Sequence, residues 1–307
     1  MSAADGPTRT KDGGGSAPLA PGLWLVSTPI GAARDITLRA LDVLGAAEVL
    51  AAEDTRSLRH LMQIHGLSPG ARPLLAYHDH NGARMRPRLL AALAEGRSVA
   101  YASEAGTPLV ADPGYQLVRA AVAAGHPVHA VPGASAALAA LAVAGLPTDR
   151  FAFLGFPPTQ AGPRATWLAE AAAIPATCIF YDSPRRLSRL LSEMIGVFGA
   201  DRPAVVCREL TKRHEEVMRG TLAELAAALE GREVKGEVVV LTDRPSTAVV
   251  GAGDLDAALD SALAGQSLRA AVDQVAVETG LPRRQVYQAA LARKKAKDGA
   301  GDAGNAR

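Results

Sequence analysis

The feature that most constrains this chain is a repeated pattern between residues 22 and 147. Short apolar segments with the length of β-strands alternate there with amphipathic segments of helical period. The apolar segments are Leu23–Ser27, Glu48–Ala52, Leu74–Tyr77, a segment that begins at Ser98, and Val128–Val131. Strands that alternate with helices fold into a sheet with helices on its faces. We therefore predict an α/β domain of five βα units over this region.

One connection in this pattern is unusually long and polar. After the strand that begins at Ser98, the chain reaches Gly114 through a loop with two glycines, two prolines, two carboxylates and two hydroxyls, and a helix is predicted from Tyr115. Most connections in such folds have about 2–6 residues. Open α/β sheets bind ligands beyond the carboxyl ends of their strands. We predict that this loop forms part of a binding site, and an ordinary βα turn is the alternative.

A second α/β domain with a mixed sheet is predicted to follow. Its strands are expected at Phe151–Leu154, Thr177–Tyr181, Ala204–Cys207, Glu216–Arg219 and Glu237–Thr242, and its helices at Arg164–Ala172, Arg185–Phe198 and Leu222–Glu230. The close spacing of the strands over 204–219 indicates an antiparallel portion. The predicted limits are a disordered tail over 1–21, α/β domains over 22–147 and 148–243, a linker over 244–253, a helical domain over 254–297 and a second tail over 298–307.

The C-terminal region is predicted to be helical and basic. Helices over 267–279 and 283–295 are separated by Gly280-Leu281-Pro282, a spacing typical of a helix-turn-helix, with a generic helical hairpin as the alternative. No acidic residue occurs between 283 and 297, where the basic residues are Arg283, Arg284, Arg293, Lys294, Lys295 and Lys297. Such an end suits a nucleic-acid phosphate backbone, or is a solvated helix end.

Composition excludes several classes of protein. Hydrophobic residues make up 48% of the 307 residues, as in globular proteins. No run of about 18 apolar residues is present, so no membrane span is expected. Cys178 and Cys207 lie in apolar segments and are expected to be buried thiols in a reducing cytoplasm. The segment His78-Asp79-His80 has no further clustered ligand, so we expect no metal site.

Polar residues at the predicted helix starts are candidate N-caps. Asp35 and Ser135 are placed to cap the helices that follow them, and Ser267 is placed to cap one of the C-terminal helices. The tetrapeptide Glu53-Asp54-Thr55-Arg56 brings two carboxylates and a guanidinium to a strand-to-helix junction. It is either part of a site or a structural group in which Asp54 or Thr55 caps the helix and Arg56 pairs with an acid.

A set of motifs then carries a resemblance across residues 22–243. In order along the chain they are Leu25–Gly31 with Asp35–Leu41, Ala52–Arg56, Tyr77–Asn81, Ser103–Pro108 with Ala111–Tyr115, Val131–Ala136, Leu146–Arg150, Gly155-Phe156, Tyr181–Arg185 and Arg208–Lys212. The set resembles the bacterial ribosomal RNA small subunit methyltransferase I family, within the tetrapyrrole-methylase-like (class III) S-adenosylmethionine methyltransferases. The C-terminal helical region resembles that of the same family. Ala32, Glu104, Ala134 and Asp182 depart from the family pattern, where Asn, Asp, Pro and Glu are more usual.

The resemblance implies a fold, a reaction and a set of site residues. It implies two α/β domains with a cofactor cleft between them, a cytoplasmic homodimer, and S-adenosyl-L-methionine-dependent 2′-O-methylation of a cytidine ribose in the decoding centre of 16S rRNA. By resemblance the cofactor residues are Pro29, Ile30, Gly31, Ser103, Glu104, Ala105, Gly106, Thr107, Pro132, Gly133, Ser135, Ala136 and Tyr181. The expected RNA contacts are Arg56, Arg185, Arg283, Arg284, Lys294 and Lys295.

A ribose hydroxyl is a poor nucleophile, so a positioned base would assist methyl transfer. The candidates are Glu53, Asp54 and Lys212, the last of these if burial lowers its pKa and Glu209 does not keep it charged. A site of carboxylates and prolines suits a cationic methyl donor, and neither a phosphate-binding P-loop nor a G-x-G-x-x-G motif is present. Methylation of a tetrapyrrole and a non-catalytic nucleic-acid-binding role are the alternative functions.

Overall fold

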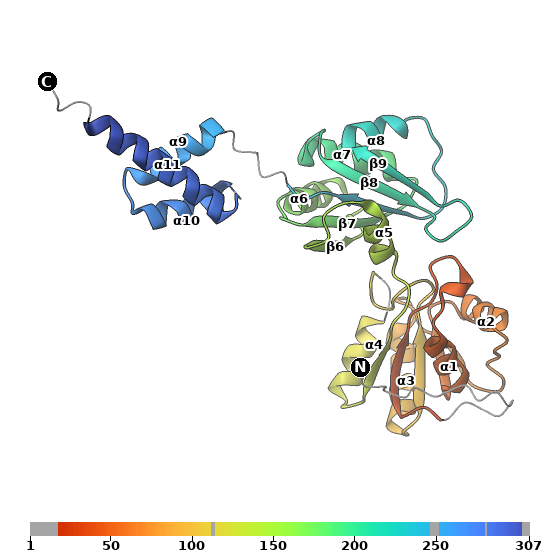
Figure 1. Ribbon diagram of the computed structural model, residues 1–307. Helices are drawn as coiled ribbons and strands as arrows, with labels where there is room; N and C mark the ends of the chain where they lie inside the picture. The colour runs from red at the N-terminus through yellow and green to blue at the C-terminus, as the bar shows by residue number, and fades with distance from the viewer. Residues whose placement is uncertain (1–17, 112–113, 246–251, 280, 303–307) are drawn as a thin grey trace. The chain divides into compact units, whose positions relative to one another are not determined.

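The computed structural model describes residues 18–111, 114–245, 252–279 and 281–302, with the backbone alone described over 252–254, 277–278 and 294–302. The chain separates into two compact units, residues 1–244 and 245–307 (Figure 1). Among the described residues, no helix is long and apolar enough to cross a membrane.

The first half of the larger unit is built on a parallel five-stranded sheet. Its strands are β1 (Gly22–Val26), β2 (Val49–Ala52), β3 (Leu74–Ala76), β4 (Ser98–Ala102) and β5 (Val128–Val131), in the order β3-β2-β4-β1-β5. A short 3-10 turn, η1 (Ala33–Asp35), precedes the first α-helix. Helices α1 (Leu38–Ala46) and α2 (Thr55–Ile64) cover one face, and α3 (Gly82–Ala94) and α4 (Tyr115–Ala123) cover the other. All four helices therefore begin at the carboxyl edge of the sheet.

The fifth helix joins this sheet to the second one. Helix α5 (Ala136–Ala144) is apolar on all sides, and its buried residues Ala137, Ala140 and Leu141 pack against the second sheet. It follows β5 directly, so the chain passes from one sheet to the other within a single βα unit (Figure 1). The carboxyl edge of the first sheet is thereby joined to the second half.

The second sheet is mixed, as its strand spacing predicts. Its strands are β6 (Phe151–Gly155), β7 (Thr177–Asp182), β8 (Pro203–Arg208), β9 (Glu216–Thr221) and β10 (Val238–Thr242), in the order β6-β7-β10-β8-β9. Only the β6–β7 pair is parallel. Helices α6 (Ala161–Ala172), α7 (Leu187–Phe198) and α8 (Leu222–Ala228) pack on the face opposite α5.

The smaller unit consists of three helices with their own core. Helices α9 (Ala252–Leu263), α10 (Leu268–Thr279) and α11 (Arg283–Asp302) bury Leu259, Val272, Val275 and Val286 completely. The hydroxyl of Ser267 accepts a hydrogen bond from the backbone N–H of Ala270, as predicted for a cap. The turn after α10 includes Gly280, which lies outside the described residues.

Several local predictions require correction. Thr37, not Asp35, caps α1, because the chain makes the turn η1 before the helix starts. Ser135 occupies the N-cap position of α5 without a capping hydrogen bond from its side chain. The predicted N-terminal tail is too long at its inner end, since Leu19 is buried in the core beside Trp24. Helix α11 continues through residues 298–302, a stretch predicted to belong to the C-terminal tail. Residues 1–17 and 303–307 of the predicted tails lie outside the described part of the chain.

Candidate functional site

Three loops at the carboxyl edge of the first sheet are joined into one wall. Thr28 and Gly106 exchange two backbone hydrogen bonds, of 2.9 and 3.0 Å. The hydroxyl of Ser103 donates to the carbonyl oxygen of Gly106 at 2.6 Å, and that of Thr107 donates to the carbonyl oxygen of Ala134 at 3.0 Å. Loops 28–31, 103–107 and 132–136 are therefore fixed to one another before any ligand binds.

Two glycines make this close approach possible. A Cβ on Gly133 would lie 2.8 Å from the Cβ of Ser27, so loop 132–136 can lie against the end of β1 only with glycine there. Gly106 has a φ of +82°, in the left-handed region that favours glycine, and a Cβ there would lie 3.3 Å from Ile30. Both positions belong to the motifs that carry the family resemblance.

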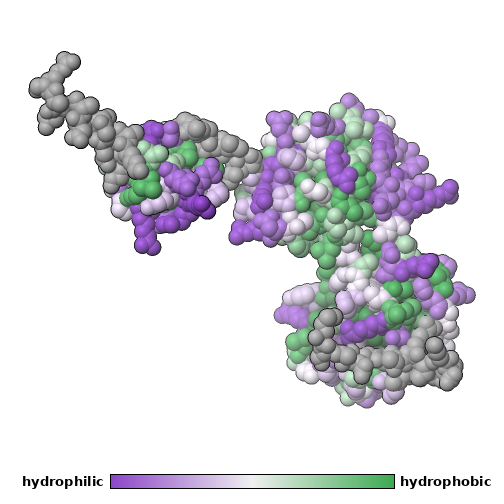
Figure 2. Space-filling model, viewed as in Figure 1, coloured by the Kyte–Doolittle hydropathy of each residue, from purple (hydrophilic) through white to green (hydrophobic). Residues whose placement is uncertain are grey.

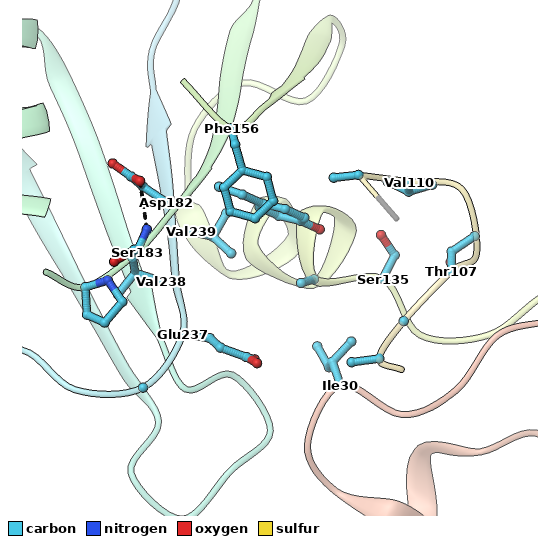
Figure 3. Close-up of a pocket in the computed structure, with 17 residues that line it drawn as sticks. Ile30, Thr107, Val110, Ser135, Phe156, Asp182, Ser183, Glu237, Val238 and Val239 are labelled. Carbon is cyan, nitrogen blue, oxygen red and sulfur yellow. Dashed lines mark hydrogen bonds between the residues drawn. The ribbon is translucent and has the colours of Figure 1, made fainter. Parts of the chain in front are cut away.

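The wall borders a cavity of about 290 Å³ that the second half of the unit completes (Figure 3). This volume is near the lower end of that of small-molecule sites. Its lining is largely apolar and includes the carboxylates of Asp182 and Glu237. The lining residues are Ile30, Ala105, Gly106, Thr107, Val110, Ala111, Ser135, Ala136, Phe156, Tyr181, Asp182, Ser183, Pro184, Gly236, Glu237, Val238 and Val239.

Tyr181 connects the two sides of the cavity. Its hydroxyl accepts a hydrogen bond of 3.0 Å from the backbone N–H of Ala137 in the first turn of α5. Its ring contacts Phe153 and Phe156 edge to face. Next to it, Asp182 is buried and accepts hydrogen bonds from the Ser183 backbone N–H and the Arg186 guanidinium. The carboxylate at position 182 is thus held by its own loop.

A charged group lies beside Glu237, at one side of the cavity. The Lys212 ammonium donates to Glu209 at 2.9 Å and to Glu237 at 3.0 Å. Although burial lowers the pKa of Lys212, its hydrogen bonds to Glu209 and Glu237 raise that pKa above the ordinary value. A proton acceptor needs a lowered pKa, so the condition under which Lys212 would act as a base is not met.

Loop 209–212 also supports the first wall. Glu209 and Thr211 have positive φ angles of 51° and 65°, and the Thr211 hydroxyl accepts a hydrogen bond of 3.1 Å from the Ala32 backbone N–H. A Cβ on Gly31 would lie 2.5 Å from the Cγ of Lys212. Position 32, where the family more usually has asparagine, therefore contributes its backbone to this contact.

The candidate bases Glu53 and Asp54 have different environments. Asp54 caps α2 by accepting from the backbone N–H groups of Arg56 at 2.7 Å and Ser57 at 3.4 Å. The first of these hydrogen bonds is the main reason why the pKa of Asp54 is lowered. The carboxylate of Asp54 therefore serves as a helix cap, which is the structural interpretation of the segment Glu53-Asp54-Thr55-Arg56.

Glu53 is half-buried at the end of β2 and takes no part in the cap of α2. One of its carboxylate oxygens is buried and has no hydrogen-bond partner among the described residues. Burial raises the pKa of Glu53, and the charges of Glu104 and Asp79 raise it further, against a hydrogen bond from the backbone N–H of Glu104. Glu53, Asp79 and Glu104 follow the neighbouring strands β2, β3 and β4, and we call these three residues the edge carboxylates.

The structure separates the predicted cofactor residues into two sets. Ile30, Ala105, Gly106, Thr107, Ser135, Ala136 and Tyr181 line the cavity. Pro29, Gly31, Ser103, Glu104, Pro132 and Gly133 do not; of these, Ser103, Gly31 and Gly133 hold the loops together, and Glu104 is exposed beside Glu53. Sequence reasoning missed Glu237 and Val110 as lining residues, while Phe156 and Asp182 belong to motifs already noted.

The predicted RNA-binding residues also differ in environment. Arg56 is 90% exposed and lies 3.7 Å from Asp54, and Arg185 is exposed. In the helical unit, Arg283 pairs with Asp273, and Arg293 pairs with Asp256 and Asp260. Arg284 is exposed without an acidic partner among the described residues. The side chains of Lys294 and Lys295 lie outside the described part of the structure.

Within the described residues, no three His, Cys, Asp or Glu side chains are grouped so that they could hold a metal ion. Cys178 and Cys207 are both buried free thiols, and burial raises the pKa of each to about 11.

Comparison with known proteins identifies the family. Residues 22–226 match the model of the tetrapyrrole (corrin/porphyrin) methylases, and residues 249–294 match that of the RsmI C-terminal HTH domain. Ribosomal RNA small subunit methyltransferase I of Mesorhizobium japonicum is 45% identical over 94% of this chain and 97% of its own length. The protein of the same name from Pseudomonas aeruginosa is 42% identical over 89% of this chain and 97% of its own.

Solved structures share the fold of the larger unit. A cobalt precorrin-4 methyltransferase superposes with a TM-score of 0.56 at 21% identity, covering 72% of this chain and 94% of its own. A uroporphyrin-III C-methyltransferase from Thermus thermophilus, complexed with S-adenyl homocysteine, gives a TM-score of 0.51 at 22% identity, covering 72% of this chain and 97% of its own. Together with the near full-length matches above, these comparisons show that the chain belongs to the ribosomal RNA small subunit methyltransferase I family of the tetrapyrrole methylases.

Proposed function

We propose that this protein transfers a methyl group from S-adenosyl-L-methionine to the 2′-hydroxyl of a cytidine ribose in 16S rRNA, within the decoding centre of the small ribosomal subunit. The observation that carries the proposal is Glu53, a carboxylate with an unpartnered oxygen beside loop 103–107, whose later residues line the cavity. Relatives at 39–45% identity that bear the name of an rRNA methyltransferase support the choice of substrate.

The cavity has the chemistry that a cationic cofactor needs. Lys212 is shared by the two carboxylates Glu209 and Glu237, so this group carries a net charge of −1 at the cavity. The hydroxyls of Ser135 and Tyr181 and the apolar side chains of Ile30 and Val239 complete a lining suited to an adenosine. When bound there, S-adenosylmethionine supplies an electrophilic methyl group on a sulfonium.

In the proposed reaction, the ribose hydroxyl lies at the carboxyl edge of the first sheet, where the edge carboxylates hold it and accept its proton. Bound S-adenosylmethionine would supply the methyl group to the ribose oxygen, and the sulfur would keep the electron pair of the broken carbon–sulfur bond. Glu53 takes the hydroxyl proton. Holding the reacting atoms in line contributes up to about 7–11 kcal/mol, and the base about 10²–10⁴-fold in rate.

Glu53 is tested by replacing it with glutamine. We expect Glu53→Gln to bind S-adenosylmethionine normally in calorimetry and to methylate unmodified 30S particles about 10²–10⁴-fold more slowly. Asp54→Asn is the matched control, because asparagine also caps a helix, and it should keep most of its activity. Full turnover by Glu53→Gln would remove the proposed base.

The pH dependence gives a second readout of the same residue. A base must be ionised to accept a proton, and the pKa of Glu53 is raised by burial and by the charges of Glu104 and Asp79. Turnover by the native protein should therefore rise with pH through that raised pKa and level off above it. Glu53→Gln should lose this dependence on the acid side.

We also propose that the protein works as a cytoplasmic homodimer, without a metal ion. Helix α5 supports the dimer, because Leu138 and Val143 on its outer side are 54% and 38% exposed in the single chain. Figure 2 shows hydrophobic surface in this region, between the two halves of the larger unit. A second copy that covers this helix would remove those side chains from water.

A further inference from the structure

The carboxyl edge of the first sheet carries an unusual distribution of arginines. Helix α2 contains Arg56 and Arg59, and helix α3 contains Arg84, Arg86 and Arg88; neither helix contains an acidic residue. Arg56, Arg59, Arg84 and Arg88 are exposed. We call these five residues the edge arginines.

Two of these arginines, Arg56 and Arg84, lie in the first turn of a helix, where a cation is disfavoured. The N-terminus of a helix carries a partial positive charge, and a cation in its first turn is disfavoured, where an anion would gain about 0.3–1 kcal/mol. Arg56 is the second residue of α2, where the N-cap Asp54 supplies one carboxylate. Arg84 is the third residue of α3, which has no acid at its N-cap or in its first turn. A bound anion would offset this repulsion.

The edge arginines also lack partners within the protein. Among the described residues, no carboxylate lies within ion-pair distance of Arg59, Arg84, Arg86 or Arg88, and Arg56 has only the 3.7 Å contact with Asp54. The Nε atom of Arg86 is buried without a hydrogen-bond partner. Elsewhere in the unit, arginines such as Arg164 and Arg232 are paired with carboxylates at 2.6–2.9 Å. The edge arginines are therefore available to an external anion.

The fold places the edge arginines on both sides of the edge carboxylates. Helix α2 packs on one face of the sheet and α3 on the other. Glu53 lies two residues before α2, and Asp79 three residues before α3. The edge carboxylates at the strand ends therefore lie between the arginines of α2 on one side of the sheet and the arginines of α3 on the other.

We infer that the edge arginines bind the phosphates that flank the target ribose, so that the RNA strand crosses this edge between α2 and α3. An RNA strand alternates anionic phosphates with uncharged riboses, and this alternation matches the alternation of arginines and carboxylates. This inference rests on the proposed function and adds to it the surface that positions the RNA strand over Glu53. Arg59, Arg84, Arg86 and Arg88 have no role in the cofactor cavity.

The test uses two charge-reversal variants of the full chain, Arg56→Glu/Arg59→Glu and Arg84→Glu/Arg88→Glu. The control is Arg119→Glu/Arg150→Glu, which changes the net charge equally at two exposed arginines that lie away from this edge and have no acidic partner among the described residues. Affinity for an unmodified 16S rRNA fragment is measured by fluorescence anisotropy at several salt concentrations. Affinity for S-adenosylmethionine and the melting temperature are measured alongside.

We expect each edge variant to weaken RNA binding by about tenfold or more, and to reduce the salt dependence of log K by roughly one for each phosphate that the variant no longer binds. Cofactor affinity should equal that of the control. The melting temperature should not fall below that of the control, because a glutamate in the first turn of a helix is favoured where an arginine is not. KM for 30S particles should rise more than kcat falls. Edge variants that bind RNA with the affinity and salt dependence of the control would overturn the inference.

The proposed reaction and the proposed RNA-binding surface can be disproved separately. If the native protein binds the RNA through the edge arginines but transfers no methyl group to it, the proposed reaction is wrong and the surface stands. If the native protein methylates 30S particles and the edge variants do so with unchanged KM, the reaction stands and the surface is wrong. Binding of the native protein to anionic lipid vesicles but not to RNA would overturn both.

Discussion

Glu237 shows how one residue can set the charge of the cofactor cavity. Its side chain is 72% exposed and projects towards the cavity (Figure 3). Lys212 donates a hydrogen bond to one of its oxygens. Because Lys212 also binds Glu209, the single ammonium cannot neutralise both carboxylates. The remaining negative charge favours a cationic ligand over a neutral or anionic one.

Replacing Glu237 with glutamine should therefore weaken cofactor binding. We expect Glu237→Gln to lower the affinity for S-adenosylmethionine about 3- to 5-fold, the size of effect typical of an exposed charge pair. Glu233→Gln is the control, since Glu233 forms a similar exposed pair with Lys235 and does not line the cavity. Calorimetry that gives both variants the native affinity would contradict this account.

At the residue scale, the sequence motifs predicted part of the candidate site. The chemical role of each residue in it was harder to predict. Ile30, Gly106 and Ser135, which the motifs predict as cofactor residues, line the cavity. The choice between Glu53 and Lys212 could not be made from the sequence, because it depends on the distance from Lys212 to Glu237, 25 residues away. Glu237 gave no signal of its own, since it stands at the start of an otherwise ordinary apolar strand.

At the scale of elements, helix α5 performs two packing tasks. One side is buried against the second sheet, and the other exposes Leu138 and Val143. A helix that is apolar all round is normally buried on all sides in a folded protein. The most direct way to bury the exposed side is a symmetric contact with a second copy, which agrees with the proposed homodimer.

This contact can be tested with a charge on α5. Leu138→Glu should shift the protein from dimer to monomer in analytical ultracentrifugation, because a dimer contact would bury the new carboxylate. Val122→Glu is the matched control, as Val122 is 61% exposed on α4, on the first sheet. A dimer that persists in Leu138→Glu, or a native chain that is monomeric, would contradict the proposed interface.

The elements themselves were well predicted, because apolar periodicity marks buried strands and helices directly. Each of the ten predicted strands occurs within the described residues, with ends that differ by one or two residues, as at β9. The packing of α5 on the second sheet was not predictable in the same way. A helix without a polar face gives no indication of which neighbour covers it.

At the scale of the whole molecule, the two units have separate cores. Among the described residues, every residue of the cavity and of the larger unit's cores lies before position 244. The buried side chains of the helical unit form a core of their own, and its exposed Arg284 has no acidic partner among the described residues. We therefore expect the larger unit to fold and bind cofactor alone, and the helical unit to add RNA affinity through the chain that links them.

A chain that ends at Arg244 tests this division. We expect it to keep the native affinity for S-adenosylmethionine and most of kcat at saturating 30S particles, because the cavity and Glu53 are intact. Its KM for 30S particles should rise by roughly 10²-fold, since a tethered second site raises overall affinity by about 10²–10⁴-fold.

Arg284→Glu in the full chain should give a smaller rise of the same kind, while Arg283→Gln, which alters an arginine already paired with Asp273, should change KM little. A truncated chain with native KM would mean that the edge arginines alone position the substrate, and one that loses kcat at saturation would mean that the helical unit takes part in the reaction itself.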